Sequence, residues 1–411
     1  MTEIAITRLG HRGDGIGEGP DGRTIYAART LPGEVIAGEI DGDRIETPAI
    51  VAPAAERVSA PCLHYRSCGG CALMHASDSF VADWKTQVIA TALAAQGLDA
   101  AIRPIATSPP RSRRRATLAG RRTKKGALVG FHARRSDTIV PITDCHVLAP
   151  VLMAAVPVLE DITRLGGSRA GVLSFAMTQT ESGVDLRVTG GKPLDGPLRA
   201  ALGGFAGHFV RLTWEDEPIF AATSPLVRLG NAAVTPPPGA FLQATAHGEA
   251  ALLSAVEEVT DGASRIADLF AGCGTFALPL ARRAAVHAVE GEASLLAALD
   301  AGARHARGLK PVTTEMRDLF RRPMMVSELS AYDAVVIDPP RAGAEAQTRA
   351  LAEARVPRIA AVSCNPVTFA RDAAILTRAG YRLNWVQPVD QFRWSTHVEL
   401  AASLTLAHID L

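Results

Sequence analysis

The sequence predicts an α/β protein in which a doubly wound, mostly parallel β-sheet follows a small β-barrel and a central α+β region. From about residue 240 onward, strand-like apolar runs alternate with Ala-rich helical stretches, which is the pattern of βαβ units. The first fifty-odd residues contain short apolar runs separated by many glycines, as small barrels do. A chain of 411 residues is also too long for one ordinary core, so two or three domains are expected.

The N-terminal and central parts contain short elements. Strands are expected at residues 3–9, 24–27 and 35–40, with glycine turns between them. A helix is expected over residues 77–96, because apolar side chains recur there at helical spacing. These patterns, with a Thr-Pro-Pro-Pro-Gly turn at 235–239, divide the chain into a barrel over 1–56, a central domain over 57–235 and an α/β domain over 236–411.

The charge is distributed unevenly along the chain. The net charge is only +1, yet residues 103–135 contain eleven Lys or Arg and no Asp or Glu. Such a run is either a solvated face or a phosphate-binding surface, because clustered cations release counterions from nucleic acid. No apolar run of about 18 residues is present, and the first four residues do not resemble a secretory signal. A cytoplasmic protein with no membrane partner is therefore expected.

A glycine-rich turn follows the strand expected at 265–270. It contains Gly272 and Gly274 and precedes a helix, so that a ligand can approach the backbone closely. A dinucleotide fingerprint would place a third glycine where Ala277 stands. Glu290 ends the next strand, over 286–290, where a carboxylate can accept both ribose hydroxyls of an adenosyl group. This combination favours S-adenosylmethionine over a nicotinamide cofactor, with another nucleotide as the alternative.

The other strands of this domain also end in candidate site residues. Asp338 follows the strand at 334–337 and precedes two prolines that stiffen its turn. Asp318, in the loop before that strand, is either an adenine contact or a surface carboxylate. Cys364 follows the strand at 359–363. A lone cysteine is usually an inert packed residue, but a thiol at a strand end beside a cofactor site is placed for nucleophilic attack. The candidate cofactor contacts near the turn are Phe270, Gly272, Gly274, Thr275, Glu290, Asp318 and Asp338.

Methylation of a uracil ring at carbon 5 requires such a thiol. Carbon 5 is not nucleophilic enough to take a methyl group directly. Addition of a thiolate at carbon 6 creates an enolate whose carbon 5 can attack a sulfonium methyl. A base must then remove the carbon 5 proton. Glu399 and His397, at the edge of a strand-like run over 398–406, are the two candidates for this base. On position alone, Glu399 is equally well read as a surface carboxylate.

Four motifs together resemble one family, the RNA uracil-5-methyltransferases, and in particular its branch with an N-terminal TRAM domain and an iron–sulfur cluster. They are the cofactor turn at 268–275, Asp-Pro-Pro-Arg at 338–341, Ser-Cys-Asn-Pro at 363–366 and His-Val-Glu at 397–399. The resemblance covers nearly the whole chain. It implies a Rossmann-like class I methyltransferase domain, an OB-like TRAM barrel at the N-terminus and 5-methyluridine as the product.

The resemblance also implies roles for single residues. Cys364 would be the nucleophile and Glu399 the proton-abstracting base. The family's Phe-x-Gln segment stands at 241–243, so Gln243 would contact the cofactor or the base. Thr245 stands where Asn often follows this segment, and Thr275 stands where Asn is common in the cofactor turn. These two departures leave the fine contacts open.

A second group of cysteines lies far from Cys364 in the sequence. Three close cysteines and one downstream indicate a metal centre, since a reducing cytosol disfavours disulfides. Their spacing alone fits zinc and a four-thiolate iron–sulfur cluster equally. The resemblance implies a [4Fe–4S] cluster with a structural role, while a redox or RNA-contacting role stays open. The expected ligands are Cys62, Cys68, Cys71 and Cys145.

RNA is the expected partner, with the protein acting as a monomer. The resemblance places RNA-facing arginines at 113–115 and 121–122, where they could contact phosphate or stack on unpaired bases. It favours 23S ribosomal RNA over transfer RNA as the substrate. Two other classes stay open. An amino-group nucleic-acid methyltransferase would carry an aromatic residue in place of Arg341 and would not need Cys364. A non-enzymatic RNA-binding module would leave the cofactor turn without a role.

Overall fold

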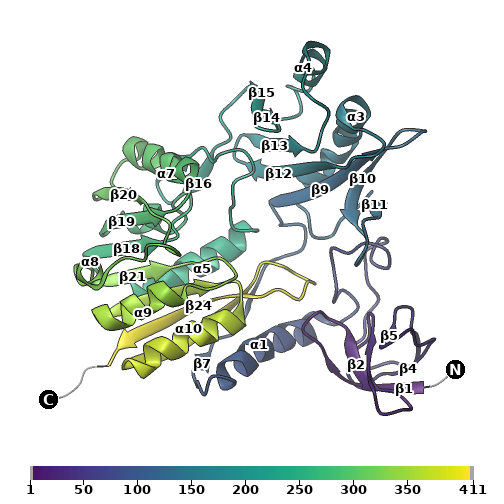
Figure 1. Ribbon diagram of the computed structural model, residues 1–411, viewed down its shortest axis with the longest axis horizontal. Coiled ribbons are helices and arrows are strands. Elements are labelled where there is room, and N and C mark those ends of the chain that lie inside the picture. The colour runs from purple at the N-terminus through teal and green to yellow at the C-terminus, as the bar shows by residue number, and fades with distance from the viewer. Residues whose placement is uncertain (1–2, 408–411) are drawn as a thin grey trace.

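The described residues fold around three large β-sheets and one two-stranded sheet, and Figure 1 shows the large sheets as an N-terminal, a central and a C-terminal region. The computed structural model describes residues 3–407. The first two residues of the predicted barrel and the last four of the predicted α/β domain therefore lie outside the described residues. No helix in the described part of the chain is long and apolar enough to cross a membrane.

The N-terminal region is a curled six-stranded sheet with the strand order β5-β3-β2-β1-β4-β6. Buried isoleucines such as Ile4, Ile36 and Ile45 form its small core. The strand expected over 35–40 is shorter in the structure and ends at Ala37. A Cβ on the next residue, Gly38, would stand 2.5 Å from Ile45 Cγ2. The strands are β1 (Glu3–Leu9), β2 (Gly15–Glu18), β3 (Thr24–Ala27), β4 (Val35–Ala37), β5 (Arg44–Ile45) and β6 (Ala49–Ala52).

The central region is a seven-stranded sheet in the order β11-β10-β9-β12-β13-β14-β15, with its own core around Phe175 and Trp214. A separate pair, β16 and β17, follows it. The strands of the seven-stranded sheet are β9 (Arg115–Arg122), β10 (Ala127–His132), β11 (Ile139–Pro141), β12 (Leu173–Thr180), β13 (Gly183–Thr189), β14 (Arg211–Trp214) and β15 (Glu217–Ala221). The separate pair is formed by β16 (Val227–Leu229) and β17 (Ala232–Val234). The helices of the region are α2 (Pro150–Ala154), α3 (Val156–Gly166) and α4 (Gly196–Gly203).

The C-terminal region is a nine-stranded sheet in which β20-β19-β18-β21-β22 run parallel and β24 and β23 complete the order. β24 pairs antiparallel with both β22 and β23. Two short strands from before the central sheet, β7 and β8, join the far edge by pairing with β23. The strands are β7 (Ala101–Ile102), β8 (Ala106–Thr107), β18 (Arg265–Leu269), β19 (Ala285–Glu290), β20 (Val312–Met316), β21 (Ala334–Ile337), β22 (Arg358–Ser363), β23 (Tyr381–Asp390) and β24 (Glu399–Leu406).

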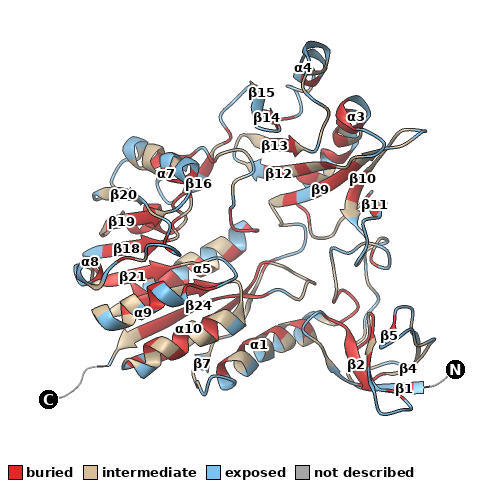
Figure 2. Cartoon of the chain, viewed as in Figure 1, coloured by how far each residue is buried: buried red, intermediate tan, exposed pale blue. Residues whose placement is uncertain are grey.

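Helices cover both faces of this sheet, which confirms the predicted doubly wound α/β domain. Two separate apolar cores fill the two faces. Figure 2 shows the strands as mostly buried and the outer helix faces as exposed. The helices on one face are α5 (Ala246–Val259), α6 (Ala277–Leu280) and α7 (Ala293–His305), and those on the other are α8 (Val326–Leu329), α9 (Glu345–Ala354), α10 (Pro366–Arg378) and α1 (Asp78–Ala94).

Helix α1 links the N-terminal half of the chain to the C-terminal sheet. The Ser77 hydroxyl caps its N-terminus by accepting a hydrogen bond from the Phe80 amide at 3.2 Å. The start of α1 thus agrees with the helix expected over 77–96. Its apolar residues Ile89 and Leu93 belong to the core that covers β21 to β24. The helix therefore packs against the α/β domain, although it precedes the central sheet in sequence.

Candidate active site

The glycine-rich turn lies at the carboxyl end of β18, as predicted. Phe270, Gly272 and Gly274 all adopt positive φ values, of 63°, 56° and 94°. A Cβ on Gly274 would stand 2.8 Å from Leu278 Cγ, so this glycine lets α6 pack closely on the turn. A Cβ on Gly272 would meet no atom within 4 Å. Gly272 therefore borders open space at the site where a ligand is expected.

Glu290, at the end of β19, faces this turn. Its carboxylate accepts the Gly272 amide at 2.9 Å and the Glu292 amide at 2.9 Å. Asp318 lies beyond the end of β20, where its half-exposed carboxylate accepts the Phe320 amide at 3.0 Å. The Phe320 ring lies 5.4 Å from the Phe270 ring. The structure thus brings the predicted cofactor residues of three strands to one edge of the sheet.

Two further carboxyl groups point to a ligand that carries donors and positive charge. Asp268 is fully buried, and neither of its oxygens has a hydrogen-bond partner among the described residues. Burial, with the nearby charge of Asp338, raises the pKa of Asp268 well above its ordinary value. Burial raises the pKa of Asp338 itself to about 7. Unpaired buried acceptors are costly, so these residues fit the cationic amino and sulfonium groups of S-adenosylmethionine.

Cys364 follows β22 directly, and its turn is tied to the Asp-Pro-Pro-Arg turn. Asn365 caps α10 by accepting the Val367 amide at 3.1 Å, while its own amide donates to the Arg341 carbonyl at 2.9 Å. The Thr368 hydroxyl donates to the same carbonyl at 3.2 Å. The structure therefore holds Cys364 and Asp338 side by side at neighbouring strand ends, since β21 and β22 are parallel partners.

Glu399 lies next to Cys364 because Ser363 of β22 pairs with Leu400 of β24. Its side chain is only 4% exposed, and burial and the charge of Asp338 raise the pKa of Glu399 to about 8. Burial and the charge of Glu399 in turn raise the pKa of the Cys364 thiol. His397 is exposed and lies 3.4 Å from Arg341 Nη2, and desolvation lowers its pKa.

Gln391 connects Gln243 and Glu399, two of the predicted site residues, and was not itself predicted from the sequence. Its Nε2 donates to Gln243 Oε1 at 2.6 Å and also to Glu399 Oε2. Its Oε1 accepts the Thr245 backbone amide at 3.3 Å. All four side chains are at least 95% buried. Gln391 carries no charge and matches no motif, and its position just before the His-Val-Glu segment was the only signal that could have found it.

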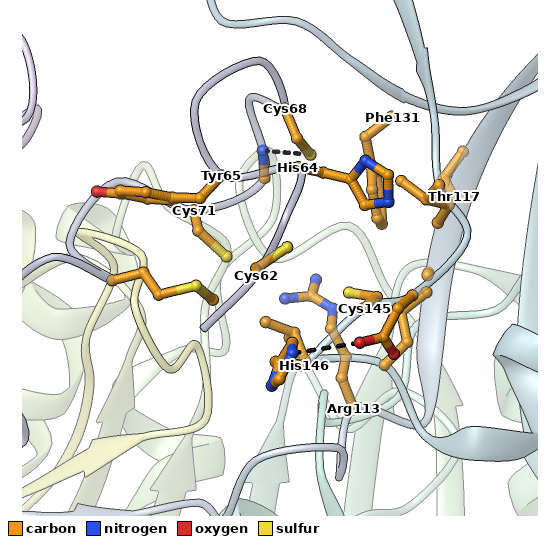
Figure 3. Close-up of a pocket in the computed structure, with 17 residues that line it drawn as sticks. Cys62, His64, Tyr65, Cys68, Cys71, Arg113, Thr117, Phe131, Cys145 and His146 are labelled. Carbon is orange, nitrogen blue, oxygen red and sulfur yellow. Dashed lines mark hydrogen bonds and ion pairs between the residues drawn. The ribbon is translucent and has the colours of Figure 1, made fainter. Parts of the chain in front are cut away.

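The four cysteines that the sequence predicts as cluster ligands line one cavity of about 310 Å³ (Figure 3). They are Cys62, Cys68, Cys71 and Cys145. All are free thiols. Burial, together with the charges of neighbouring cysteines, raises the pKa of Cys68 and Cys71. No group of three or more His, Cys, Asp or Glu side chains in residues 3–407 forms a site for a single metal ion. The four cysteines share the lining of this cavity with thirteen other residues.

The loop between β23 and β24 contacts this cysteine-rich segment. Its Trp394 carbonyl accepts the backbone amides of Ala72 and Leu73 at 2.8 and 2.9 Å, directly after Cys71. At the start of the same loop, buried Lys85 of α1 forms an ion pair with Asp390 at 2.6 Å. Figure 1 shows this yellow loop reaching from the C-terminal sheet toward the N-terminal half. The loop that ends at Glu399 is therefore held from outside its own sheet.

In the structure, most cations of the basic stretch at 103–135 either form ion pairs within the protein or stand exposed. Five cations pair with acidic side chains elsewhere in the chain, namely Arg103, Arg111, Arg114, Arg134 and Arg135. Lys124, Lys125 and Arg122 stand exposed at the β9–β10 hairpin. Arg115 lies near the candidate active site, 4.3 Å over the ring of Phe241, which is 54% exposed. Paired arginines such as Arg114 act within the fold rather than as free phosphate contacts.

A doubly wound sheet with a glycine turn, an acidic residue ending the second strand and the unpaired buried carboxylate of Asp268 defines a class I methyltransferase, which uses S-adenosylmethionine. Comparisons with known proteins agree. Residues 235–406 match the protein family described as tRNA (Uracil-5-)-methyltransferase. An uncharacterized RNA methyltransferase of Brucella suis is 46% identical over 98% of this chain and 97% of its own length. The 23S rRNA (uracil(1939)-C(5))-methyltransferase of Halomonas elongata is 33% identical over 99% of this chain and 90% of its own length.

A solved structure has the same fold. The tRNA (uracil-54, C5)-methyltransferase of Pyrococcus abyssi, in complex with S-adenosyl-L-homocysteine, superposes with a TM-score of 0.77 at 22% identity. The match covers 98% of this chain and 99% of that one. The chain therefore belongs to the RNA (uracil-5-)-methyltransferase family, and it is an S-adenosylmethionine-dependent RNA (uracil-5-)-methyltransferase.

Proposed function

We propose that the protein methylates carbon 5 of a uridine through a covalent bond between Cys364 and carbon 6 of the ring. The observation that carries this proposal is the register of β22 against β24, which brings Cys364 and the buried Glu399 together beside Asp338. A thiol and a carboxyl group at the same end of the sheet are the two groups that this reaction needs.

Each residue would act at one point of the reaction. Cys364 adds to carbon 6 as a thiolate, and the resulting carbon 5 nucleophile accepts the methyl group that S-adenosylmethionine supplies. Glu399 then takes the proton from carbon 5, and Cys364 leaves. Burial gives Glu399 a pKa of about 8, so its carboxylate is a stronger base than an exposed one. Burial and the charges of Glu399 and Asp338 raise the pKa of the Cys364 thiol, and the positive charge of Arg341 offsets part of that rise in favour of the thiolate.

The cofactor would lie over the glycine turn. Glu290 is the candidate ribose contact, and Asp268, which the sequence reasoning did not single out, is a candidate partner for the cofactor's cationic groups. The other proposed contacts are Gln243, Phe270, Gly272, Gly274, Thr275, Asp318 and Asp338.

Two variants test the covalent route. Cys364→Ala should abolish methyl transfer and keep RNA binding. Glu399→Gln should accumulate a protein–RNA adduct, seen as a shifted band in a denaturing gel, because the proton on carbon 5 is then retained. His397→Asn is the matched control, since His397 is exposed and should leave turnover within about threefold of the parent. Full activity of Cys364→Ala would refute the covalent route, and normal turnover of Glu399→Gln would make His397 the better candidate for the base.

We also propose that Cys62, Cys68, Cys71 and Cys145 hold a [4Fe–4S] cluster, which would fix the cysteine-rich segment against the loop before Glu399. Four free thiols around one cavity fit four-thiolate ligation of a body larger than one ion. Arg113 lines the same cavity, where its positive charge offsets part of the rise in the pKa of Cys71 that burial and the neighbouring cysteines cause. Anaerobic purification should yield a coloured protein with stoichiometric iron and sulfide. A colourless protein containing stoichiometric zinc would contradict the cluster.

The RNA substrate that we favour is 23S ribosomal RNA, with transfer RNA as the alternative. The whole-length relative from Halomonas elongata is named for 23S rRNA, and it is more similar to this chain than the Pyrococcus abyssi tRNA enzyme. The curled N-terminal sheet would serve as an RNA-binding TRAM domain. Mapping 5-methyluridine in ribosomal and transfer RNA from a strain that lacks the gene decides between the two. Loss of 5-methyluridine from transfer RNA alone would refute the ribosomal assignment.

A further inference from the structure

The amide of Gln391 can adopt only one orientation in this structure. Its Oε1 faces the Thr245 backbone amide at 3.3 Å, and a backbone N–H can only donate. The oxygen of Gln391 must therefore point to Thr245, which leaves Nε2 to face Glu399 and Gln243. Thr245 is itself fixed, because its hydroxyl caps α5 by accepting the Gly248 amide at 2.9 Å.

This orientation decides which end of Gln243 is available to a ligand. Gln391 Nε2 donates to Gln243, so the accepting atom must be Gln243 Oε1. Gln243 Nε2 then remains the outer end of that amide, and it makes no hydrogen bond to any of the described residues. Gln243 consequently offers N–H donors rather than an acceptor to whatever enters the site.

Glycine at position 248 makes room for this arrangement. A Cβ on Gly248 would stand 2.7 Å from Gln391 Cβ and 3.0 Å from Gln391 Oε1. The first turn of α5 thus contains a glycine that lets Gln391 lie directly against it. An alanine there would suit the helix but would displace Gln391.

We propose that Gln391 is a positioning residue that turns the donor end of Gln243 toward the target base, holds the carboxylate of Glu399, and so helps the enzyme to select uracil over cytosine. Uracil has a carbonyl oxygen at carbon 4, which accepts a hydrogen bond, whereas cytosine has an amino group there, which donates one. A fixed N–H donor at this position favours binding of uracil and disfavours binding of cytosine. This inference rests on the proposed roles of Glu399 and Gln243.

The test compares Gln391→Met with the parent protein, because methionine keeps the volume but removes the amide. The probe is an RNA fragment that the parent protein methylates, synthesised with 5-fluorouridine or 5-fluorocytidine at the methylated position. With S-adenosylmethionine present, Cys364 adds to carbon 6 of either base and the methyl group is transferred to carbon 5, which then carries fluorine in place of the removable proton, so the adduct cannot be released. The parent should form the uridine adduct faster. In Gln391→Met the ratio of the two rates should fall at least about tenfold, the value of one hydrogen bond of 1.4 kcal/mol.

Two readouts separate this role from a general structural one. RNA affinity of Gln391→Met should match the parent, whereas release of methylated product should need a higher pH, since Glu399 loses a hydrogen bond that lowers its pKa. Gly248→Ala, which displaces Gln391 without removing its amide, should lower the ratio in the same direction by a smaller factor. An unchanged ratio in Gln391→Met would overturn the inference alone. No adduct with the parent protein would overturn the proposed function and this inference with it.

Discussion

Glu399 is a carboxyl group that the fold removes from water and places near the carboxyl group of Asp338. Desolvation and the charge of Asp338 raise its pKa to about 8, and the amide of Gln391 offsets part of that shift. Burial and the charges of Glu399 and Asp338 raise the pKa of Cys364. At neutral pH both groups therefore retain protons that the reaction requires them to lose.

This environment predicts the pH dependence of product release. A group with a raised pKa becomes a base only as the pH passes that value, so release of methylated RNA from a preformed adduct should accelerate as the pH rises through about 8. A chase experiment that follows decay of the adduct in a denaturing gel measures this step alone. A release rate that stays constant between about pH 6 and 9 would contradict the assignment of Glu399 as the base.

The two glycines of the cofactor turn should respond differently to substitution. Both Gly272→Ala and Gly274→Ala force a side chain into a left-handed conformation, at about 1–2 kcal/mol each. Gly274→Ala adds a collision with Leu278 and should lower stability by about a further 1–3 kcal/mol. Gly272→Ala meets no protein atom, so beyond the backbone cost it should mainly weaken cofactor binding. Thermal unfolding and titration with S-adenosylmethionine separate the two effects, and equal losses of stability would show that the packing argument is wrong.

At the scale of elements, the loop between β23 and β24 depends on the N-terminal half of the chain. Lys85 is fully buried on α1, and its ammonium group pairs with Asp390 and donates to the Phe392 carbonyl at 3.2 Å. The Trp394 carbonyl is held by the segment that follows Cys71. The position of Glu399 is thereby coupled to α1 and to the cysteine cavity.

Breaking the ion pair between Lys85 and Asp390 should destabilise the protein strongly. Lys85→Met leaves Asp390 buried without its ionic partner, which should cost about 3–5 kcal/mol in the free energy of unfolding. The double variant Lys85→Met/Asp390→Asn should recover part of this loss, because it removes the uncompensated charge. Urea unfolding measures both variants. A loss below about 1 kcal/mol for Lys85→Met would mean that the pair does not hold the loop.

Strand ends were predictable from the sequence, and contacts between distant segments were not. The pattern of apolar runs located β18, β19, β21 and β22, and the rule that ligands bind beyond the carboxyl ends of strands then located Cys364 and Asp338. Gln391 binds Gln243 across 148 residues, and Lys85 reaches Phe392 across 307. Neither pairing leaves a local periodicity in the sequence. The same holds for β7 and β8, whose two-residue length is too short to show a pattern.

At the scale of the whole molecule, the free part of the basic stretch is the best candidate for contact with the RNA backbone. The exposed hairpin residues Arg122, Lys124 and Lys125 have no acidic partner among the described residues, unlike the paired arginines on either side. Replacing these three by alanine should weaken RNA binding and reduce the slope of log affinity against log salt by about 0.7–0.9 for each lost phosphate contact. Arg111→Ala, which breaks an internal pair with Asp144, is the matched control and should leave the slope unchanged. An unchanged slope in the triple variant would exclude the hairpin from the RNA-binding surface.

A covalent bond between Cys364 and the target base can be measured directly. The protein is incubated with S-adenosylmethionine and an RNA fragment carrying 5-fluorouridine at the methylated position, and the adduct is digested and analysed by mass spectrometry. We expect a single modified peptide in which the nucleotide is attached to Cys364. Attachment to another cysteine, or methylation of the uridine-containing RNA with no adduct on the fluorinated one, would contradict it.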